Sequence, residues 1–490
     1  MGIIDAFGLL APGWAARWTV ARSEFLEARR RYEAAAPDRF RPARSSSGDG
    51  DAVVSSAGTR LRGYSRHLDE NHDLVIGVFD DLVNNAIGTG IGIDPHVRAT
   101  SGELHEDCND QLRRLWADFI EAPETTGQYD FVALERMMAR SVMRDGEMFA
   151  QQVRSDLYRY RTRVPLVVDL LEADYCPLDY TLADGSVTQG VERDAWGAPR
   201  AYYFYRRHPG AMSGPITVQA TDLIRKNAAA ILHPKLSKRL KQVRGVPALH
   251  GVIQRLRDVK DYEESERIAA KVAADITGWV RAGAALSAAP SPGASTRDLR
   301  MQAGMILQLN QGEEIGLLKS DRPNPNLENF RSAMLRAVAA GTGTRYSSIA
   351  RNYSGNYSSQ RQELVEGAVG YRALTAYLVG AFHRPLWRTF VEVAYLSGQL
   401  KVARGVDLQT LYRADFRAPA LPWIDPKKEA EAWALLVDTE LESRAGIQRM
   451  RGRDADHVHD EIAAERKMGF KKRTPAVDDE NESESDQEAA

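Results

Sequence analysis

The chain has 490 residues, of which 43% are hydrophobic and 27% are charged, proportions typical of a globular protein. Its 65 basic and 67 acidic residues leave a net charge of −2, which argues against a protein that holds nucleic acid through a strongly basic face. The two cysteines provide no disulfide framework and no Cys-type zinc site. No apolar run reaches about 18 residues, so we expect no membrane span.

The N-terminal part predicts a tail-like segment followed by helices. Residues 1–59 form an arginine-rich segment and a linker, because residues 45–58 are rich in Ser and Gly. Apolar residues at helical spacing then predict three amphipathic helices, over 66–87, 103–121 and 129–145.

The next stretch changes from helical to strand character. Between residues 147 and 232, β-branched and aromatic residues alternate with polar ones, and turn signals such as Asp184-Gly185 separate the runs. This pattern predicts a mainly antiparallel sheet. Together with the preceding helices, the sheet makes residues 60–248 an α+β domain.

A stalk-like unit is predicted next. Residues 249–280 favour one helix, on the order of 45 Å long, with a highly charged centre. A small insert, 281–325, follows, in which residues 305–309 (MILQL) and 314–320 (EIGLLKS) are expected to pair as a hairpin. A shorter helix over 326–340 is then expected to lead the chain back, so that the two helices form the stalk.

The most distinctive feature is the polar run from residue 341 to 362, GTGTRYSSIARNYSGNYSSQRQ. It contains three tyrosines and three arginines among Ser, Gly and Asn. Arginine binds phosphate, and tyrosine stacks or donates hydrogen bonds. An ordinary helix–helix connection needs only about 2–8 residues, so the length favours a loop presented to a large, hydrated partner.

The C-terminal part is predicted to be helical. Residues 358–397 form a long helical region with a kink at Pro385, and a further helix starts at Asp425-Pro426. The last helix covers 455–468, and the charged tail 471–490 is predicted to be disordered. The helix after Pro426 is expected to bury the apolar stripe Ala430, Trp433, Ala434, Val437 and Leu441.

Motifs for catalysis or cofactor binding are weak. The glycines of residues 88–92 are spaced G-x-G-x-G, and the strand that should precede a dinucleotide loop is replaced by a helix pattern. His457, His459 and Glu461 do not make the H-E-x-x-H zinc motif, and a solvated surface is the favoured interpretation. No Walker A sequence, G-x-S-x-G elbow or CxxC pair occurs. We therefore predict no catalytic residue, no metal and no cofactor.

The densest basic patch follows the predicted sheet. It consists of Lys235, Lys238, Arg239, Lys241 and Arg244. A solvated loop is the favoured interpretation, and contact with phosphate is the alternative, since clustered cations attract a polyanion.

Several segments resemble one family, in order along residues 28–470. They include LRGYSRHLDENHDLVIGVFDDLVNNAIGTGIG, SVMRDGEMFAQQ, GVERDAWGAPRAYYFYRRHPG and RGRDADHVHDEIAAER, and the most specific are NYSSQR and IDPKKEAEAW. On these motifs the chain resembles the lambda-type tailed-phage portal protein.

The resemblance implies a helix-rich α+β protein assembled as a ring, typically of about twelve copies, at one vertex of the virion capsid. It implies assembly in the host cytoplasm and a channel for double-stranded DNA. The implied partners are the terminase large subunit, the major capsid protein and the head-completion adaptor proteins, with no membrane. By position the regions are a wing (60–248), a stem (249–280 and 326–340), a clip (281–325), a tunnel loop (341–358) and wing- or crown-side helices (359–470).

In this interpretation the polar loop faces the DNA channel. A channel must hold DNA weakly, because each phosphate contact strengthens binding, so a few arginines and tyrosines suit it better than a densely basic lining. The candidate channel residues are Arg345, Tyr346, Arg351, Asn352 and Tyr353. The alternatives are a phage nuclease, which needs carboxylates that bind two metals, or another oligomeric capsid or connector component.

Overall fold

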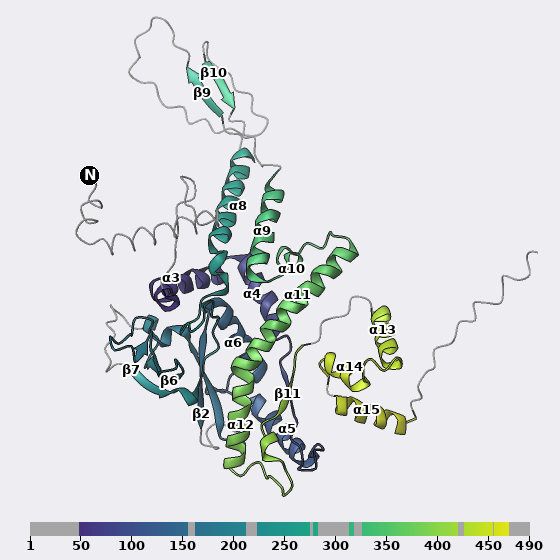
Figure 1. The fold of residues 1–490 in the computed structure, drawn as a ribbon. Coiled ribbons are helices and arrows are strands. Elements are labelled where there is room, and N and C mark those ends of the chain that lie inside the picture. The colour runs from purple at the N-terminus through teal and green to yellow at the C-terminus, as the bar shows by residue number, and fades with distance from the viewer. Residues whose placement is uncertain are drawn as a thin grey trace, which may run out of the picture. The chain divides into compact units, whose positions relative to one another are not determined.

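The computed structural model describes residues 49–154, 162–211, 223–274, 278–282, 313–317, 326–419, 426–453 and 455–469. It is a helix-rich α+β fold (Figure 1). The chain divides into two compact units, Met1–Val53 and Val54–Ala490, and the second contains nearly all described elements. The predictions for residues 1–48, for most of 281–325 and for the tail beyond 469 lie outside the described residues. None of the described helices combines the length and apolar content that a bilayer crossing requires.

The first described helix occupies part of the predicted linker. Helix α3 spans Gly50–Asn71, and α4 (Asp73–Ala86) follows after a break at His72. The linker prediction is therefore wrong from Gly50 onward, and the predicted helix 66–87 is two helices. The inward side of α3 carries polar residues such as Arg62 and Ser65, so hydrophobic periodicity did not reveal it.

Helices α5 (Glu106–Glu121) and α6 (Phe131–Asp145) confirm the next two predictions. Asp130 caps α6, because its Oδ1 accepts a hydrogen bond from the Ala133 amide at 2.7 Å. Gly146 ends the helix with a left-handed φ of 87°. These helices contribute to an aromatic cluster in the core, whose members are Trp116, Phe119, Phe131, Trp387 and Phe390.

The predicted antiparallel sheet is present as two sheets. Strand β2 (Met148–Arg154) pairs with β3 (Leu166–Glu172) on one edge and with β8 (Ile231–Leu232) on the other. The second sheet has the order β4-β5-β6-β7, formed by Val187–Thr188, Val191–Arg193, Pro199–Tyr205 and Leu223–Asn227. A separate pair, β1 (Gly92–Pro95) with β11 (Ala414–Arg417), joins distant parts of the chain and was not predicted.

The two stalk helices lie side by side (Figure 1). They are α8 (Ile253–Ala274) and α9 (Leu327–Thr342), joined by an Arg331–Glu263 ion pair of 2.6 Å. A short 3-10 turn, Ala248–Gly251, precedes α8.

The first stalk helix ends earlier than predicted, and its continuation is a strand. Strand β9 (Gly278–Ala282) pairs antiparallel with β10 (Glu313–Leu317). A Gly-Trp-Val sequence disfavours helix and favours strand, so the predicted helix over 249–280 is wrong from Gly278 onward. In the described residues the partner of β10 is β9, and the predicted partner 305–309 lies outside them.

The long C-terminal helical region is continuous but irregular. Helix α11 (Tyr357–Leu378) passes through a π-helical turn, Val379–His383, into α12 (Arg384–Leu396). Pro385 lacks an N–H and cannot donate to the carbonyl of Ala381. The regular series of α-helical hydrogen bonds is therefore interrupted one turn before the proline. The irregularity at Val379–His383 lies just before Pro385, and the kink itself stays a prediction.

Three short helices follow, α13 (Pro426–Asp438), α14 (Arg444–Met450) and α15 (Ala455–Lys467). The predicted burial of the α13 stripe is wrong, because α13 has no buried side chain within the described residues. Ala430, Ala434 and Leu441 are exposed, while Trp433 and Val437 are partly exposed. Helix α14 packs against α15.

Candidate nucleic-acid interface

The polar run folds as a short helix followed by an exposed tip. After α9 ends at Thr342, Gly343 takes a left-handed φ of 73°. Helix α10 (Tyr346–Ala350) then packs Ile349 into the core. All six residues of 351–356, which we call the tip, are exposed before α11 begins.

Local hydrogen bonds shape the tip. Arg351 adopts a left-handed φ of 50°, which turns the chain away from α10. The Asn352 Oδ1 accepts from the amide of Ser354 at 3.0 Å. Asn356 caps α11, because its Oδ1 accepts from the Ser359 amide at 2.8 Å. The tip is therefore a turn with its own polar framework.

Arg345 lies at the base of the tip and faces inward. Its side chain is 14% exposed, and its Nη2 lies 3.5 Å from Asp81 Oδ1 on α4. The guanidinium also stands 5.4 Å from the centre of the Tyr371 ring, and the Tyr371 hydroxyl donates to Asp81. Burial, and then Asp81, raise the pKa of Tyr371, so the hydroxyl keeps its proton. Arg345 therefore anchors the tip to α4 and α11.

Tyr346 is the second residue at the base. Its hydroxyl donates to Ser332 Oγ at 3.2 Å, and Arg336 lies over its ring at 5.2 Å. Of the five predicted channel residues, Arg351, Asn352 and Tyr353 are on the exposed tip, and Arg345 and Tyr346 are in the base. The partner of Arg345 is 264 positions away in the sequence, so no local pattern could have assigned it.

The predicted basic patch likewise divides into exposed residues and residues whose side chains are bound or buried. The Lys235 Nζ donates to the carbonyls of Gln242 and Val243, each at 2.7 Å. Arg244 is fully buried. The exposed cations are Lys238, Arg239 and Lys241.

Arg244 belongs to a buried charged cluster that the sequence did not reveal. The fully buried Glu147 binds Arg244 at 2.7 Å, Arg62 at 2.9 Å and His233 at 3.0 Å. It also accepts the Gly245 amide at 2.7 Å. Burial alone would raise the pKa of the Glu147 carboxyl, but Arg244, His233 and Arg62 hold it well below its usual range.

This cluster makes stability depend on pH. Burial lowers the pKa of His233 to about 4 from an ordinary value of 6.5. Between these values the unfolded chain binds the extra proton, so stability should fall as the pH drops, by up to about 1.4 kcal/mol per pH unit. Thermal melts from pH 7 to pH 4.5 should show a shallower decline for His233→Gln, and equal declines would contradict this role.

Beside this cluster lies the one group in the described residues with the spacing of metal ligands. Glu172, Asp174 and His208 place ligand atoms within 4.8 Å of one another. Three arginines already pair with these carboxylates, because Arg62 and Arg66 donate to Asp174 and Arg144 lies 3.5 Å from Glu172. The negative charge that a metal ion needs is thus neutralised, and the group does not match the two-metal centre of a nuclease.

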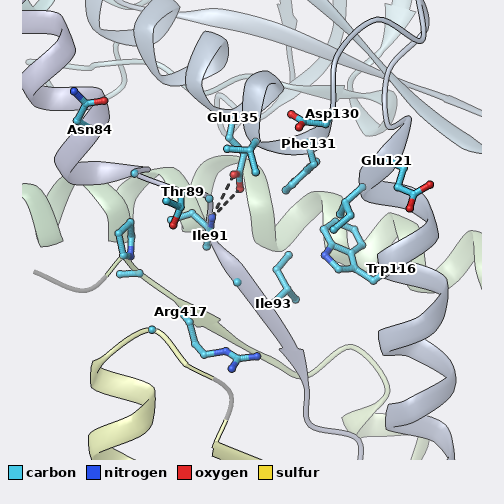
Figure 2. A pocket seen from close by; sticks show the side chains of 18 of the residues that line it. Asn84, Thr89, Ile91, Ile93, Trp116, Glu121, Asp130, Phe131, Glu135 and Arg417 are labelled. Carbon is cyan, nitrogen blue, oxygen red and sulfur yellow. Dashed lines mark hydrogen bonds between the residues drawn. The ribbon is translucent and has the colours of Figure 1, made fainter. Parts of the chain in front are cut away.

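The glycine-rich segment 88–92 borders a pocket of about 810 Å³. Figure 2 shows Glu135 reaching from α6 to the backbone of Ile91, whose amide it binds at 3.3 Å. Helix α4 precedes the glycines and strand β1 follows, the reverse of the order that a dinucleotide loop requires.

Glu135, which lines this pocket, is paired with a buried imidazole. Glu135 Oε1 lies 2.6 Å from His383 Nε2, and both side chains are fully buried. Burial raises the pKa of Glu135. Glu121 and Asp130 add further carboxylates to the lining, opposite Arg417 (Figure 2). The Ile91 amide is already bonded to a carboxylate, so the segment does not offer phosphate a free cradle of amides.

Comparisons with known proteins agree on one family. The family model described as phage portal protein, lambda family, matches residues 37–374. The probable portal protein of Halomonas phage phiHAP-1 is 26% identical over 440 residues, which cover 86% of this chain and 82% of that protein. The portal protein of Escherichia phage N15 is 24% identical over 197 residues, covering 37% of this chain and 34% of that protein.

A solved structure of the neck of an empty gene transfer agent (GTA) particle, computed with C6 symmetry, contains a similar chain. The two chains match with a TM-score of 0.49 and are 12% identical. The match covers 82% of this chain and 94% of that chain. A chain in the neck of a native GTA particle computed with C12 symmetry matches at a TM-score of 0.46, with 13% identity, and covers 82% of this chain and 98% of that one.

Proposed function

Because the chain belongs to the lambda family of phage portal proteins, a structural and non-enzymatic component of the capsid, we propose that its copies close into a ring around a DNA channel. The ring, of about twelve copies, stands at one vertex of the virion capsid. Double-stranded DNA passes through it during packaging and ejection. In a closed ring, each copy binds its two neighbours through two different, complementary surfaces. The rotation from one copy to the next must lead back to the first copy after a full turn.

The regional assignments form part of the proposal. Helices α8 and α9 form the stem, and the paired strands β9 and β10 belong to the clip. The two antiparallel sheets and helices α3 to α6 form the wing. The terminase large subunit, the major capsid protein and the head-completion adaptors bind the assembled ring.

The tip is the observation that carries the DNA-contact proposal. Arg351, Asn352 and Tyr353 are exposed on this turn. Arg345, at its base, is bound to Asp81. The single arginine in the tip of each copy gives transient phosphate contact, whereas a densely basic surface would retard DNA through counterion release. We propose that the tip of each copy faces the channel.

Ring formation is tested directly by native mass measurement combined with negative-stain images of the purified protein. We expect closed rings with a central hole and one dominant copy number. A chain that stays single when concentrated, and also in the presence of capsid proteins, would overturn the ring.

The role of the tip is tested by replacing Arg351 and Tyr353 together with Ala. Both side chains are exposed, with Tyr353 at 60%, so stability should change by less than about 0.5 kcal/mol and rings should still form. We expect a clear change in the DNA packaged or retained per particle, measured by quantifying encapsidated DNA after nuclease treatment.

The matched control is Arg372→Ala, which removes an exposed arginine from α11 outside the tip. It should package DNA like the unmodified protein. Normal packaging by the tip variant would exclude the tip from DNA contact without affecting the ring proposal. Arg345→Ala is unsuitable for this purpose, because it would leave Asp81 without its ion-pair partner.

A further inference from the structure

Two large apolar side chains project into solvent from neighbouring turns of the sheet-containing region. Leu240 is 99% exposed and Trp196 is 89% exposed. Both turns border one small recess of about 130 Å³, to which Gly197 and Lys241 contribute. We call turns 194–198 and 237–241 with this recess the two-turn surface.

The tryptophan turn is fixed by its own aspartate. The Asp194 Oδ1 accepts hydrogen bonds from the amides of Trp196 at 2.9 Å and Ala198 at 2.8 Å. Gly197 completes the turn with a left-handed φ of 90°. Trp196 is therefore held outward by the turn, although its indole has an apolar surface that burial would stabilise.

The leucine turn is fixed by a buried glutamine. The Gln242 Oε1 accepts from the amides of Lys238 at 3.0 Å and Arg239 at 3.1 Å. Its Nε2 donates to the carbonyl of Arg244 at 2.6 Å, which connects the turn to the buried cluster around Glu147. Lys241 takes a left-handed φ of 61°. Leu240 therefore projects from a braced loop.

The charges around the leucine have one sign. Lys238, Arg239 and Lys241 are all exposed on the same turn. Tryptophan and arginine are the side chains most enriched among the residues that dominate binding energy at protein interfaces. Because both turns are already ordered, a partner would bind them with little loss of conformational entropy.

We propose that the two-turn surface docks a second protein, which presents an acidic rim around an apolar recess. The cations bind the rim, and Trp196 and Leu240 enter the recess. Double-stranded DNA fits less well, because its phosphates match the cations but an apolar side chain enters the base stack only at the cost of unstacking a base step. This surface is separate from the tip, and the inference does not depend on DNA passage.

Site-specific photo-crosslinking during particle assembly tests the inference. A benzophenone amino acid replaces Trp196 or Leu240 in the full chain, and Leu408, which is also exposed, serves as the control position. We expect both test positions to crosslink to one protein other than this chain, through a segment rich in Asp and Glu beside apolar residues. Adding Lys238→Glu and Lys241→Glu to the Leu240 crosslinker should lower the yield at least tenfold.

Several outcomes would overturn the inference. Crosslinks to a second copy of this chain would make the surface a contact between copies, and crosslinks to DNA would make it a nucleic-acid site. Yields no higher than at Leu408, or yields that survive the charge reversal, would remove the surface as a docking site. Unchanged melting of each variant confirms that loss of crosslinking does not come from misfolding.

Discussion

Glu147→Gln should destabilise the protein by about 3–5 kcal/mol, because it breaks a buried ion pair while its partners stay buried. The substitution keeps the shape of the side chain and removes its charge. Arg62 and Arg244 then lack the carboxylate that binds them at 2.9 and 2.7 Å. Denaturant unfolding should show a lower midpoint, with early loss of the 237–241 turn that Gln242 and Arg244 support.

Glu172→Gln is the matched control, since it changes the same kind of group where the carboxylate side chain is 46% exposed. Its ion pairs with Arg66 and Arg144 are long, at 3.8 and 3.5 Å, and partly solvated. We expect a loss below about 1 kcal/mol. Equal losses for the two variants would show that the buried cluster contributes no more than a surface pair.

Gly245→Ala should prevent normal folding, because a methyl group at this position meets backbone. The added Cβ would lie 2.0 Å from the carbonyl oxygen of Gly146. Neither segment can move without disturbing the Gly245 amide, which donates to Glu147. The cost should exceed about 3 kcal/mol, above the usual range for overfilled cores, and should appear as low soluble yield and loss of near-UV circular dichroism.

Gly251→Ala provides the comparison for this prediction. No atom lies within 4 Å of a Cβ built at Gly251, in the turn that precedes α8. Removing the freedom of glycine from the unfolded chain should leave stability unchanged or raised by up to about 1 kcal/mol. Wild-type behaviour of Gly245→Ala would mean that the two strands of backbone separate at little cost.

The sequence predicted elements whose buried faces are apolar. Helices α5 and α6 and the antiparallel strands were found because Leu, Val and aromatic residues recur at periods that mark one face. The part of helix α3 before residue 66 was missed because its inward side includes Arg62 and Ser65. The end of α8 was missed because apolar residues continue at helical spacing past Gly278.

The candidate interface was predictable only in part, for a related reason. Turn-forming Asn, Ser and Gly predicted a polar loop over 341–358, of which 351–356 form an exposed turn while 346–350 form helix α10. Composition could not separate Arg351, which is exposed, from Arg345, which binds Asp81. The same limit applies to Lys235 and Arg244, since burial of a charged side chain depends on partners that come from distant segments.

The π-helical turn at Val379–His383 joins α11, which follows the tip, to α12, which is packed in the core. It holds one residue more than a regular helix would need over the same length. Deleting Gly380 would remove that surplus residue, while Pro385 would still lack the N–H that a regular α-helix uses at this point. The chain that leads from the core to the exposed arginine thus passes through one widened turn, remote from the tip itself.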